Sequence, residues 1–286
     1  MSLIEVKGLT KSYGDVHAVR GIDLNIEQGE IFSILGPNGA GKTTTVEILE
    51  GFRTRDLGTV SVLGFDPNTG GHQSREWRNR IGIVLQTSSD AGDLTVFETI
   101  NHFSGYYSNP RDVEEVIDSV GLQDKRAALI RNLSGGQRRR LDVALGIIGN
   151  PELIFLDEPT TGFDPEARRA FWSLIKSLRS DGATIVLTTH YLDEAEALAD
   201  RVAIINKGVI AEISTPAELG GRATSQATVH WRDGAQLKSE KTENPTAVIA
   251  ALSAAFSGEI PELVVTRPSL EDIYLEMIGG VHEKDS

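Results

Sequence analysis

Short apolar runs recur along the chain and end in glycine or in polar clusters. Residues 31–35, 153–156 and 184–187 are mainly apolar, with Val, Ile and Leu prominent. Runs of this length and composition are typical of strands buried on both faces of a parallel sheet. Residues 44–51 follow the first run with a helical pattern. Strands that alternate with helices predict an α/β fold.

Between Gln86 and Leu133 the pattern changes to helix. Thr95 is a good N-cap, and Glu98 stands three residues later, where a capping-box partner belongs. A further helix is expected over residues 112–120, closed by Gly121. We therefore expect a helical insert at about residues 87–149.

A second break falls near Gly220 and Gly221. The residues beyond it predict a small α+β module over 222–286, separate from a larger domain over 1–219. Its expected core residues are Trp231 and Phe256. The elements expected there are an edge strand at 227–231, a helix at 245–256, a short strand at 263–266 and a last helix with Ser269 as N-cap.

The first glycine-rich turn, residues 36–43, stands between an expected strand and an expected helix, as a nucleotide-binding loop requires. Its backbone N–H groups can converge on phosphates at a helix N-terminus. Lys42 is expected to contact the terminal phosphates, and the Thr43 hydroxyl to ligate Mg²⁺. The alternative is a glycine turn that matches by chance. The expected nucleotide contacts are Gly36, Pro37, Asn38, Gly39, Ala40, Gly41, Lys42, Thr43 and Thr44.

The second glycine-rich turn, residues 133–137, reads Leu-Ser-Gly-Gly-Gln. Taken alone, it is better explained as a helix-capping turn than as a ligand site. Ser134 is a sound N-cap, and Gln137 stands where a capping-box partner belongs. A role of this turn in ligand binding depends on the motifs found elsewhere in the chain.

Polar residues follow two of the expected strands. Asp157 and Glu158 come directly after residues 153–156, and His190 follows residues 184–187 through two threonines. The carboxyl edge of a parallel sheet is where ligands bind. Asp157 is suited to hold Mg²⁺, and Glu158 to act as base for an attacking water. The alternatives are a solvated turn before Pro159 and a hydrogen-bonded histidine at a sheet edge.

Together these motifs resemble the ATP-binding subunit of an ABC transporter from Leu3 to about Leu219. The resemblance implies a P-loop NTPase core with an antiparallel β subdomain and an inserted helical subdomain. The region beyond Gly221, closed by the motif that begins at Pro268, resembles the C-terminal extension of ATP subunits of daunorubicin-resistance-type exporters. The matching positions are Tyr13, the first glycine-rich turn, Gln86, the second glycine-rich turn, residues 153–157, Glu158, Asp164 and His190.

The resemblance also implies roles for these residues. Tyr13 would stack on adenine. Thr43, Gln86 and Asp157 would hold Mg²⁺. Two subunits would meet head to tail, so that each ATP lies between the first glycine-rich turn of one and the second of the other. The implied catalytic residues are Glu158, His190, Gln86 and Lys42, and those reaching ATP across the dimer are Ser134, Gly135, Gly136, Gln137 and Asp164. Phe163 replaces the more usual leucine and keeps an apolar contact.

The composition of the chain limits the classes of molecule that it can bind. The 286 residues carry a formal net charge of −13, which disfavours nucleic acid and anionic lipid as ligands. The chain has no cysteine, which excludes disulfides. Arg138, Arg139 and Arg140 are expected to form a solvated face rather than a nucleic-acid patch. Support of the phosphate end of the site by some of them is the alternative. No apolar run reaches the roughly twenty residues that span a bilayer, and residues 1–7 read as a strand rather than a leader. We expect no direct membrane insertion, and a cytoplasmic location on the inner face of the membrane through a permease.

These expectations combine into an ATPase subunit, a homodimer or a heterodimer, that drives a separate membrane permease, with export of a drug, antibiotic or lipid-like solute favoured. An importer subunit shares the same catalytic residues and stays open. A soluble ABC protein acting on ribosomes or DNA is less favoured, because such proteins usually carry two cassettes or more basic charge. A regulatory module with degenerate sites is disfavoured by Lys42, Glu158 and His190.

Overall fold

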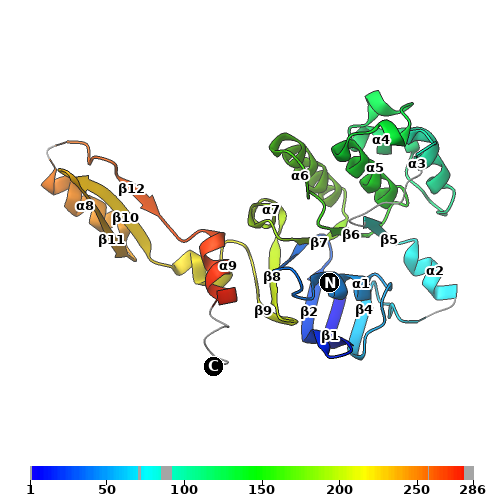
Figure 1. Cartoon of the computed structure of the whole chain (residues 1–286), viewed down its shortest axis with the longest axis horizontal. Coiled ribbons are helices and arrows are strands. Elements are labelled where there is room, and N and C mark those ends of the chain that lie inside the picture. Colours follow the sequence, from blue (N-terminus) through cyan, green and yellow to red (C-terminus); the bar gives the residue numbers. More distant parts are fainter. Residues whose placement is uncertain (1, 70–71, 85–91, 257, 280–286) are drawn as a thin grey trace. The chain divides into compact units, whose positions relative to one another are not determined.

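The structure is a computed structural model that describes residues 2–69, 72–84, 92–256 and 258–279. It divides into two compact units, one ending at Ile213 and the other beginning at Ser214. The division precedes Gly220 and Gly221, where the sequence pattern breaks. Each unit is described by itself (Figure 1).

A six-stranded sheet forms the centre of the first unit, in the order β5-β6-β7-β3-β8-β9. The pairs β5–β6, β6–β7, β7–β3 and β3–β8 are parallel. Every residue of β3 and β7 is buried, which explains their continuous apolar sequence. The strands are β3 (Ile31–Leu35), β5 (Ile81–Val84), β6 (Leu153–Asp157), β7 (Thr184–Thr189), β8 (Arg201–Asn206) and β9 (Val209–Ser214).

Helices connect these strands and cover them. Large side chains of α6 (Phe171, Ile175 and Leu178) pack with residues of β6 and β7 in one apolar cluster. These connecting helices are α1 (Lys42–Leu49), α2 (His72–Arg78), α6 (Pro165–Ser180) and α7 (Leu192–Leu198).

A second sheet in this unit is antiparallel, in the order β2-β1-β4. Its strands are β1 (Ser2–Tyr13), β2 (Val16–Glu27) and β4 (Leu57–Val62). Ile4, Val6 and Leu9 of β1 are buried with Phe32 and Ile34 of the central sheet. One face is therefore packed and the other is exposed, as alternation predicts.

The helical insert is present (Figure 1). Thr95 and Glu98 form the expected capping box at the start of α3, and Asp112 caps α4. Val96, Ile100, Val116 and Leu141 join the same apolar cluster as α6. The elements are α3 (Val96–Ser104), α4 (Val113–Ser119), the short turns Gln123–Lys125 and Ile130–Asn132, and α5 (Gly135–Ile147).

The second unit is an α+β module in which α8 packs on one face of a three-stranded sheet, order β11-β10-β12. Residues 227–231 were expected to form an edge strand, which is wrong, because β10 lies between two partners. Trp231 and Phe256 belong to the core as expected. The elements are η3 (Leu219–Thr224), β10 (Ala227–Asp233), β11 (Gln236–Thr242), α8 (Pro245–Ala255), β12 (Val264–Thr266) and α9 (Leu270–Gly279), the last with Ser269 and Asp272 in a capping box.

Candidate nucleotide-binding site

The first glycine-rich turn joins β3 to α1 and accepts only glycine at two positions. A Cβ on Gly36 would lie 2.2 Å from the carbonyl oxygen of Ile205. Gly41 has φ +105°, and its Cβ would lie 2.4 Å from the carbonyl oxygen of Ala18. The turn is therefore held against the backbone of neighbouring strands, with a conformation that other residues rarely adopt.

The side chain of Lys42 is hydrogen-bonded to the backbone of this turn. Its Nζ donates to the carbonyl oxygens of Gly36, at 2.8 Å, and Pro37, at 3.3 Å. The side chain is 5% exposed. Burial lowers the pKa of this ammonium, while the charges of Glu158 and Asp157 act to raise it. A buried cation thus stands between the turn and the acidic end of β6.

The rest of the turn presents an open surface. Asn38, Gly39 and Thr43 are exposed, and Pro37 and Thr44 are half-buried. Ala40 is buried, and its carbonyl accepts the N–H of Gly208 at 2.9 Å. Exposed N–H groups on a fixed turn at a helix N-terminus suit phosphate.

Asp157 and Glu158 end β6 beside β7. The hydroxyl of Thr188 donates to Oδ1 of Asp157. The N–H of Glu158 lies 3.1 Å from both the carbonyl and the hydroxyl oxygen of Thr188. Glu158 has φ +43°, a strained value for a residue with a side chain. Thr188 therefore holds the carboxylate of Asp157 and the backbone of Glu158, and strain at Glu158 is typical of a functional position.

His190 lies against Glu158. Its Nδ1 is 3.3 Å from Oε1 of Glu158. On the other side, the hydroxyl of Thr161 is 3.4 Å from Oε2. The two strand ends predicted to meet therefore bring Asp157, Glu158 and His190 together, with Lys42 in electrostatic range.

The residues present fit a magnesium ion. The hydroxyl of Thr43 is exposed, and the carboxylate of Asp157 is half-buried at the same edge of the sheet. Both are hard oxygen ligands, and Mg²⁺ keeps several waters beside one or two protein ligands and the phosphates. The third expected ligand, Gln86, lies outside the described residues.

The second glycine-rich turn is a helix cap. The hydroxyl of Ser134 accepts the N–H of Gln137 at 3.3 Å, and Oε1 of Gln137 accepts the N–H of Ser134 at 3.0 Å. Ser134 and Gly135 are exposed. A Cβ on Gly135 or Gly136 would meet nothing within 4 Å. The turn's own fold explains the serine and the glutamine, but not the glycines.

Two further expected residues lie at the borders of this region. Asp164 is exposed and caps α6, with its carboxylate accepting the N–H of Ala167 at 2.7 Å. Tyr13 ends β1 with 40% of its surface exposed. Cations of Lys11 and Arg53 each lie 5.5 Å from its ring centre.

Arg139 corrects one expectation. The arginines after the second glycine-rich turn were expected to form a solvated face, but Arg139 is 8% exposed. Its guanidinium donates to the carbonyl oxygens of Asp157, at 2.9 Å, and Pro159, at 3.1 Å. Helix α5 is thus attached to the end of β6. The alternative, that one of these arginines supports the phosphate end of the site, fits the contacts of Arg139 with the end of β6. Thr188 is the site residue that sequence reasoning missed, since it acts through residues remote in sequence.

These features define a P-loop nucleotide-binding protein with the subdomains of an ATP-binding cassette. A family model described as "ABC transporter" matches residues 19–161. The chain belongs to the ABC transporter family, as an ATP-binding subunit that hydrolyses ATP. In the described part of the chain, no helix is long and apolar enough to cross a bilayer.

Curated relatives match nearly the whole chain. It is 36% identical to daunorubicin/doxorubicin resistance ATP-binding protein DrrA of Streptomyces peucetius, over 96% of this chain and 92% of the relative. It is 35% identical to Nod factor export ATP-binding protein I of Cupriavidus metallidurans, over 97% of this chain and 98% of the relative.

Solved structures match the cassette. One is cbiO1 of Clostridium perfringens, part of an ABC transporter complex, with TM-score 0.69 and 26% identity over 76% of this chain and 90% of that one. Another is a dimeric ATP-binding cassette in a post-hydrolysis state with ADP and Pi, with TM-score 0.67 and 26% identity over 74% and 98%. The expected fold class, with β and helical subdomains, is confirmed.

Proposed function

We propose that this subunit forms a head-to-tail dimer on ATP and drives export through a separate membrane permease. The observation that carries the proposal is the contact of Glu158 with His190 beside Asp157, at the sheet edge where Lys42 stands. This arrangement supplies a base, a residue that orients it, an oxygen ligand for a metal and a cation for phosphate.

Each residue has a distinct task. Lys42 and the N–H groups of the first glycine-rich turn bind the phosphates, and Tyr13 stacks on the base. Glu158 accepts the proton of the attacking water, and His190 holds the γ-phosphate and orients Glu158. Mg²⁺, held by Thr43, Asp157 and Gln86, neutralises phosphate charge when bound.

The second glycine-rich turn supports the dimer. Its exposed Gly135 and half-buried Gly136 have free space where a side chain would stand, and the turn caps its own helix without using that space. In the dimer, Ser134, Gly135, Gly136 and Gln137 grip the γ-phosphate of the partner's ATP, and Asp164 crosses beside them. One chain then carries two half-sites, so a homodimer or a heterodimer is the working form.

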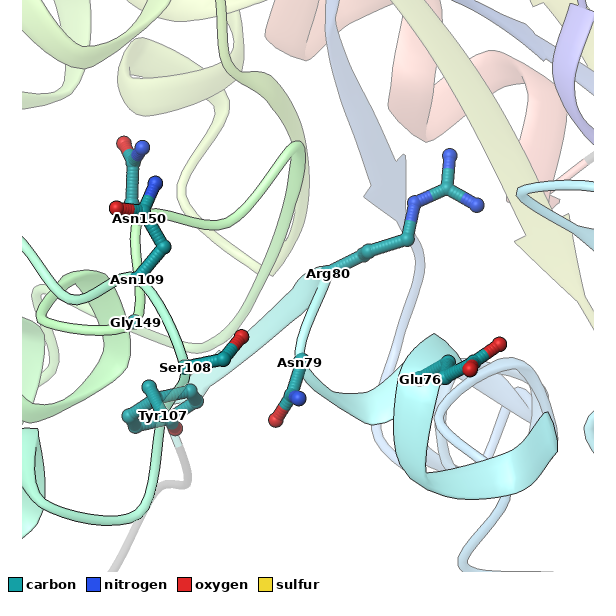
Figure 2. A pocket seen from close by; sticks show the side chains of 8 residues that line it. All are labelled: Glu76, Asn79, Arg80, Tyr107, Ser108, Asn109, Gly149 and Asn150. Carbon is teal, nitrogen blue, oxygen red and sulfur yellow. The ribbon is translucent and has the colours of Figure 1, made fainter. Parts of the chain in front are cut away.

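The permease meets the helical insert. Of four aromatic residues on this insert, Phe97 and Tyr107 are partly buried, whereas Phe103 and Tyr106 are 37% and 67% exposed. Tyr107 lines a pocket of about 260 Å³ with Asn79 and Arg80 of the core (Figure 2). Arg80 directly precedes β5, which leads towards Gln86. Phe103 and Tyr106 are the exposed aromatics of the insert, and aromatic side chains are enriched at partner surfaces.

Export is favoured over import by the full-length similarity to DrrA and to Nod factor export proteins. The solute is then drug-like or lipid-like and touches the permease only. This function places the chain on the inner face of the membrane, with residues 1–219 as the cassette and 222–286 as an accessory module. Detergent extraction tests the direction: recovery with a polytopic protein alone supports export, and recovery with a solute-binding protein supports an importer.

Glu158→Gln tests the site. The variant keeps the size of the side chain but loses the base, so we expect ATP binding to persist, turnover to fall at least about 100-fold, in line with loss of general-base catalysis, and a closed dimer to accumulate. Turnover is measured by phosphate release, and assembly by size exclusion with ATP.

Glu152→Gln is the matched control. This acid lies at the other end of β6 and is bound to Arg80 at the surface. It should retain parental turnover. If Glu158→Gln hydrolysed ATP at the parental rate, the assignment of Glu158 as the base would be wrong. If the unmutated protein hydrolysed no ATP at any protein concentration, the chain would be a regulatory module with degenerate sites.

A further inference from the structure

Helices α6 and α7 start from the two residues through which the proposed dimer acts. Asp164, proposed to cross to the partner, is the N-cap of α6. His190 stands directly before Tyr191, the N-cap of α7. The two helices then contact each other through side chains that the proposed chemistry does not use.

The inner contact is buried. Nε1 of Trp172, on α6, donates to Oε1 of Glu194, on α7, at 3.3 Å. Glu194 has no exposed surface. Burial raises the pKa of its carboxyl, while Thr189, Thr160 and Trp172 beside it act to lower it. Burying a carboxyl group costs folding free energy. Packing of α6 against α7 could be achieved by an apolar side chain, so the presence of Glu194 is not explained by packing alone.

The outer contact reaches the histidine. Nη1 of Arg168, one turn before Trp172, lies 2.9 Å from Oδ2 of Asp193. Its guanidinium is also 4.8 Å from the ring centre of Tyr191, and that ring lies 4.1 Å from the ring of His190. A continuous series of contacts thus joins α6 to the imidazole. We call the five residues Arg168, Trp172, Tyr191, Asp193 and Glu194 the α6–α7 clasp.

The clasp also adjoins the segment between the base and Asp164. Thr160 is fully buried, and its hydroxyl lies near enough to Glu194 to lower the pKa of that carboxyl. Among the described residues, however, neither this hydroxyl nor Oε2 of Glu194 makes a hydrogen bond of ordinary geometry. Buried polar atoms are seldom left unpaired. A small movement of the segment could pair this hydroxyl with Glu194, so the arrangement is suited to two positions of the segment.

We propose that the α6–α7 clasp couples the two interface residues within one protomer. When Asp164 engages the partner, α6 moves with it, and Trp172 and Arg168 carry that movement through α7 to His190 and its contact with Glu158. The inference rests on the proposed function for the roles of Asp164 and His190. Trp172, Glu194, Arg168 and Asp193 are then positioning residues, which affect turnover without touching ATP.

Trp172→Phe and Glu194→Gln test this in the full chain. Phe keeps the ring but loses the N–H donor, and Gln keeps the acceptor but loses the ionisable group. We expect kcat to fall about tenfold, a common cost of disturbing a positioned catalytic group, with KM and the affinity for ATP within twofold. Asp193→Asn, at an exposed position, should lower kcat two- to threefold, a small share of the same effect.

A coupling test separates transmission from packing. Asp164→Ser keeps a capping oxygen for α6 but shortens the reach. If the clasp transmits the contact of Asp164, adding Trp172→Phe to Asp164→Ser lowers kcat no further. Trp231→Phe, the same chemical change in the core of the second unit, is the control and should leave kcat at the parental value.

The outcomes are distinct. Parental kcat in Trp172→Phe and in Asp193→Asn overturns the inference, as does a full additional loss of kcat when Trp172→Phe is added to Asp164→Ser. If Glu194→Gln does not fold, the other two variants decide. Two other results count against the proposed function instead: no ATP hydrolysis by the unmutated protein, or hydrolysis by Glu158→Gln at the parental rate.

Discussion

The two glycine-rich turns of this chain are built in opposite ways. The first is enclosed: Gly36 stands against the backbone of Ile205, and Lys42 holds two carbonyls of the turn. The second is open: Ser134 and Gln137 complete a helix cap, and the glycines beside them face free space. An enclosed turn holds a shape that one molecule needs by itself. An open turn with satisfied hydrogen bonds leaves its glycines available to a second molecule.

The helices that follow the turns differ in the same region. Glu50, the C-cap of α1, is buried within electrostatic range of Asp157. Helix α5 contains Arg139, which is buried and bound to the backbone of Asp157. Burial and the negative charge of Asp157 raise the pKa of Glu50, whereas burial lowers the pKa of Arg139 against the charge of Asp157 and of two further acids. The end of β6 is thus bound by α5, while the acid at the end of α1 keeps its proton near neutral pH.

Glu50→Gln should give the largest change in stability. Burial, with smaller contributions from Asp157 and Glu47, raises the pKa of Glu50 to about 8. The folded state therefore holds this proton more tightly than the unfolded chain, and stability falls as pH rises from about 4.5 to 8. We expect Glu50→Gln to be more stable than the parent by about 4 kcal/mol at pH 9.

Denaturant unfolding without nucleotide or Mg²⁺ measures this, at pH values from 5 to 9. The advantage of the variant should vanish near pH 4.5 and level off above pH 8. Glu47→Gln, at the half-buried neighbour, is the control: it keeps the buried carboxyl of Glu50, so the fall in stability between about pH 4.5 and 8 should remain. An advantage of Glu50→Gln that stayed constant with pH would show that titration is not its cause.

Gly36→Ala and Gly135→Ala compare the turns directly. The new methyl at Gly36 meets a carbonyl oxygen at 2.2 Å, and the one at Gly135 meets nothing within 4 Å. We expect Gly36→Ala to lose about 3 kcal/mol of stability through overpacking, or to be insoluble. Gly135→Ala should change it by less than about 1 kcal/mol, with a slight gain because alanine favours helix. Similar losses in thermal unfolding would remove the distinction between an enclosed turn and an open one.

Local signals made most of this region predictable. The strand, turn and helix around Lys42 are contiguous in sequence, and the capping boxes at Thr95, Ser134 and Ser269 need only four residues each. Arg139 was expected chiefly on a solvated face, because helical spacing does not reveal that carbonyl groups at the end of β6 lie within its reach. The central place of β10 was missed for the same reason: β11 is polar and largely exposed, so its sequence gives no alternating apolar signal.

Lys42→Ala and Gly135→Asp compare the turns as ligand sites. Loss of the Lys42 ammonium removes a charge-assisted contact to phosphate, so affinity of the monomer for ATP should fall about 100-fold, or roughly 2.7 kcal/mol. Gly135→Asp places a carboxylate where only a partner's nucleotide would come, so monomer affinity should stay within twofold. Titration with a fluorescent ATP analogue at protein concentrations below dimer formation measures both. Equal losses would mean that both turns bind the same nucleotide within one chain.

Substitutions of Ser134 have the smallest expected effect on folding. Two of them separate its role as the cap of α5 from its proposed contact with the partner's γ-phosphate. Ser134→Ala loses the cap of α5 and should cost about 1 kcal/mol of stability. Ser134→Asp keeps a capping oxygen, so stability should return to near the parental value, while its negative charge repels the partner's γ-phosphate. We therefore expect Ser134→Asp to unfold like the parent and to bind ATP as a monomer, yet not to form the ATP dimer in the Glu158→Gln background. If Ser134→Asp dimerised normally there, the second glycine-rich turn would be a helix cap and nothing more.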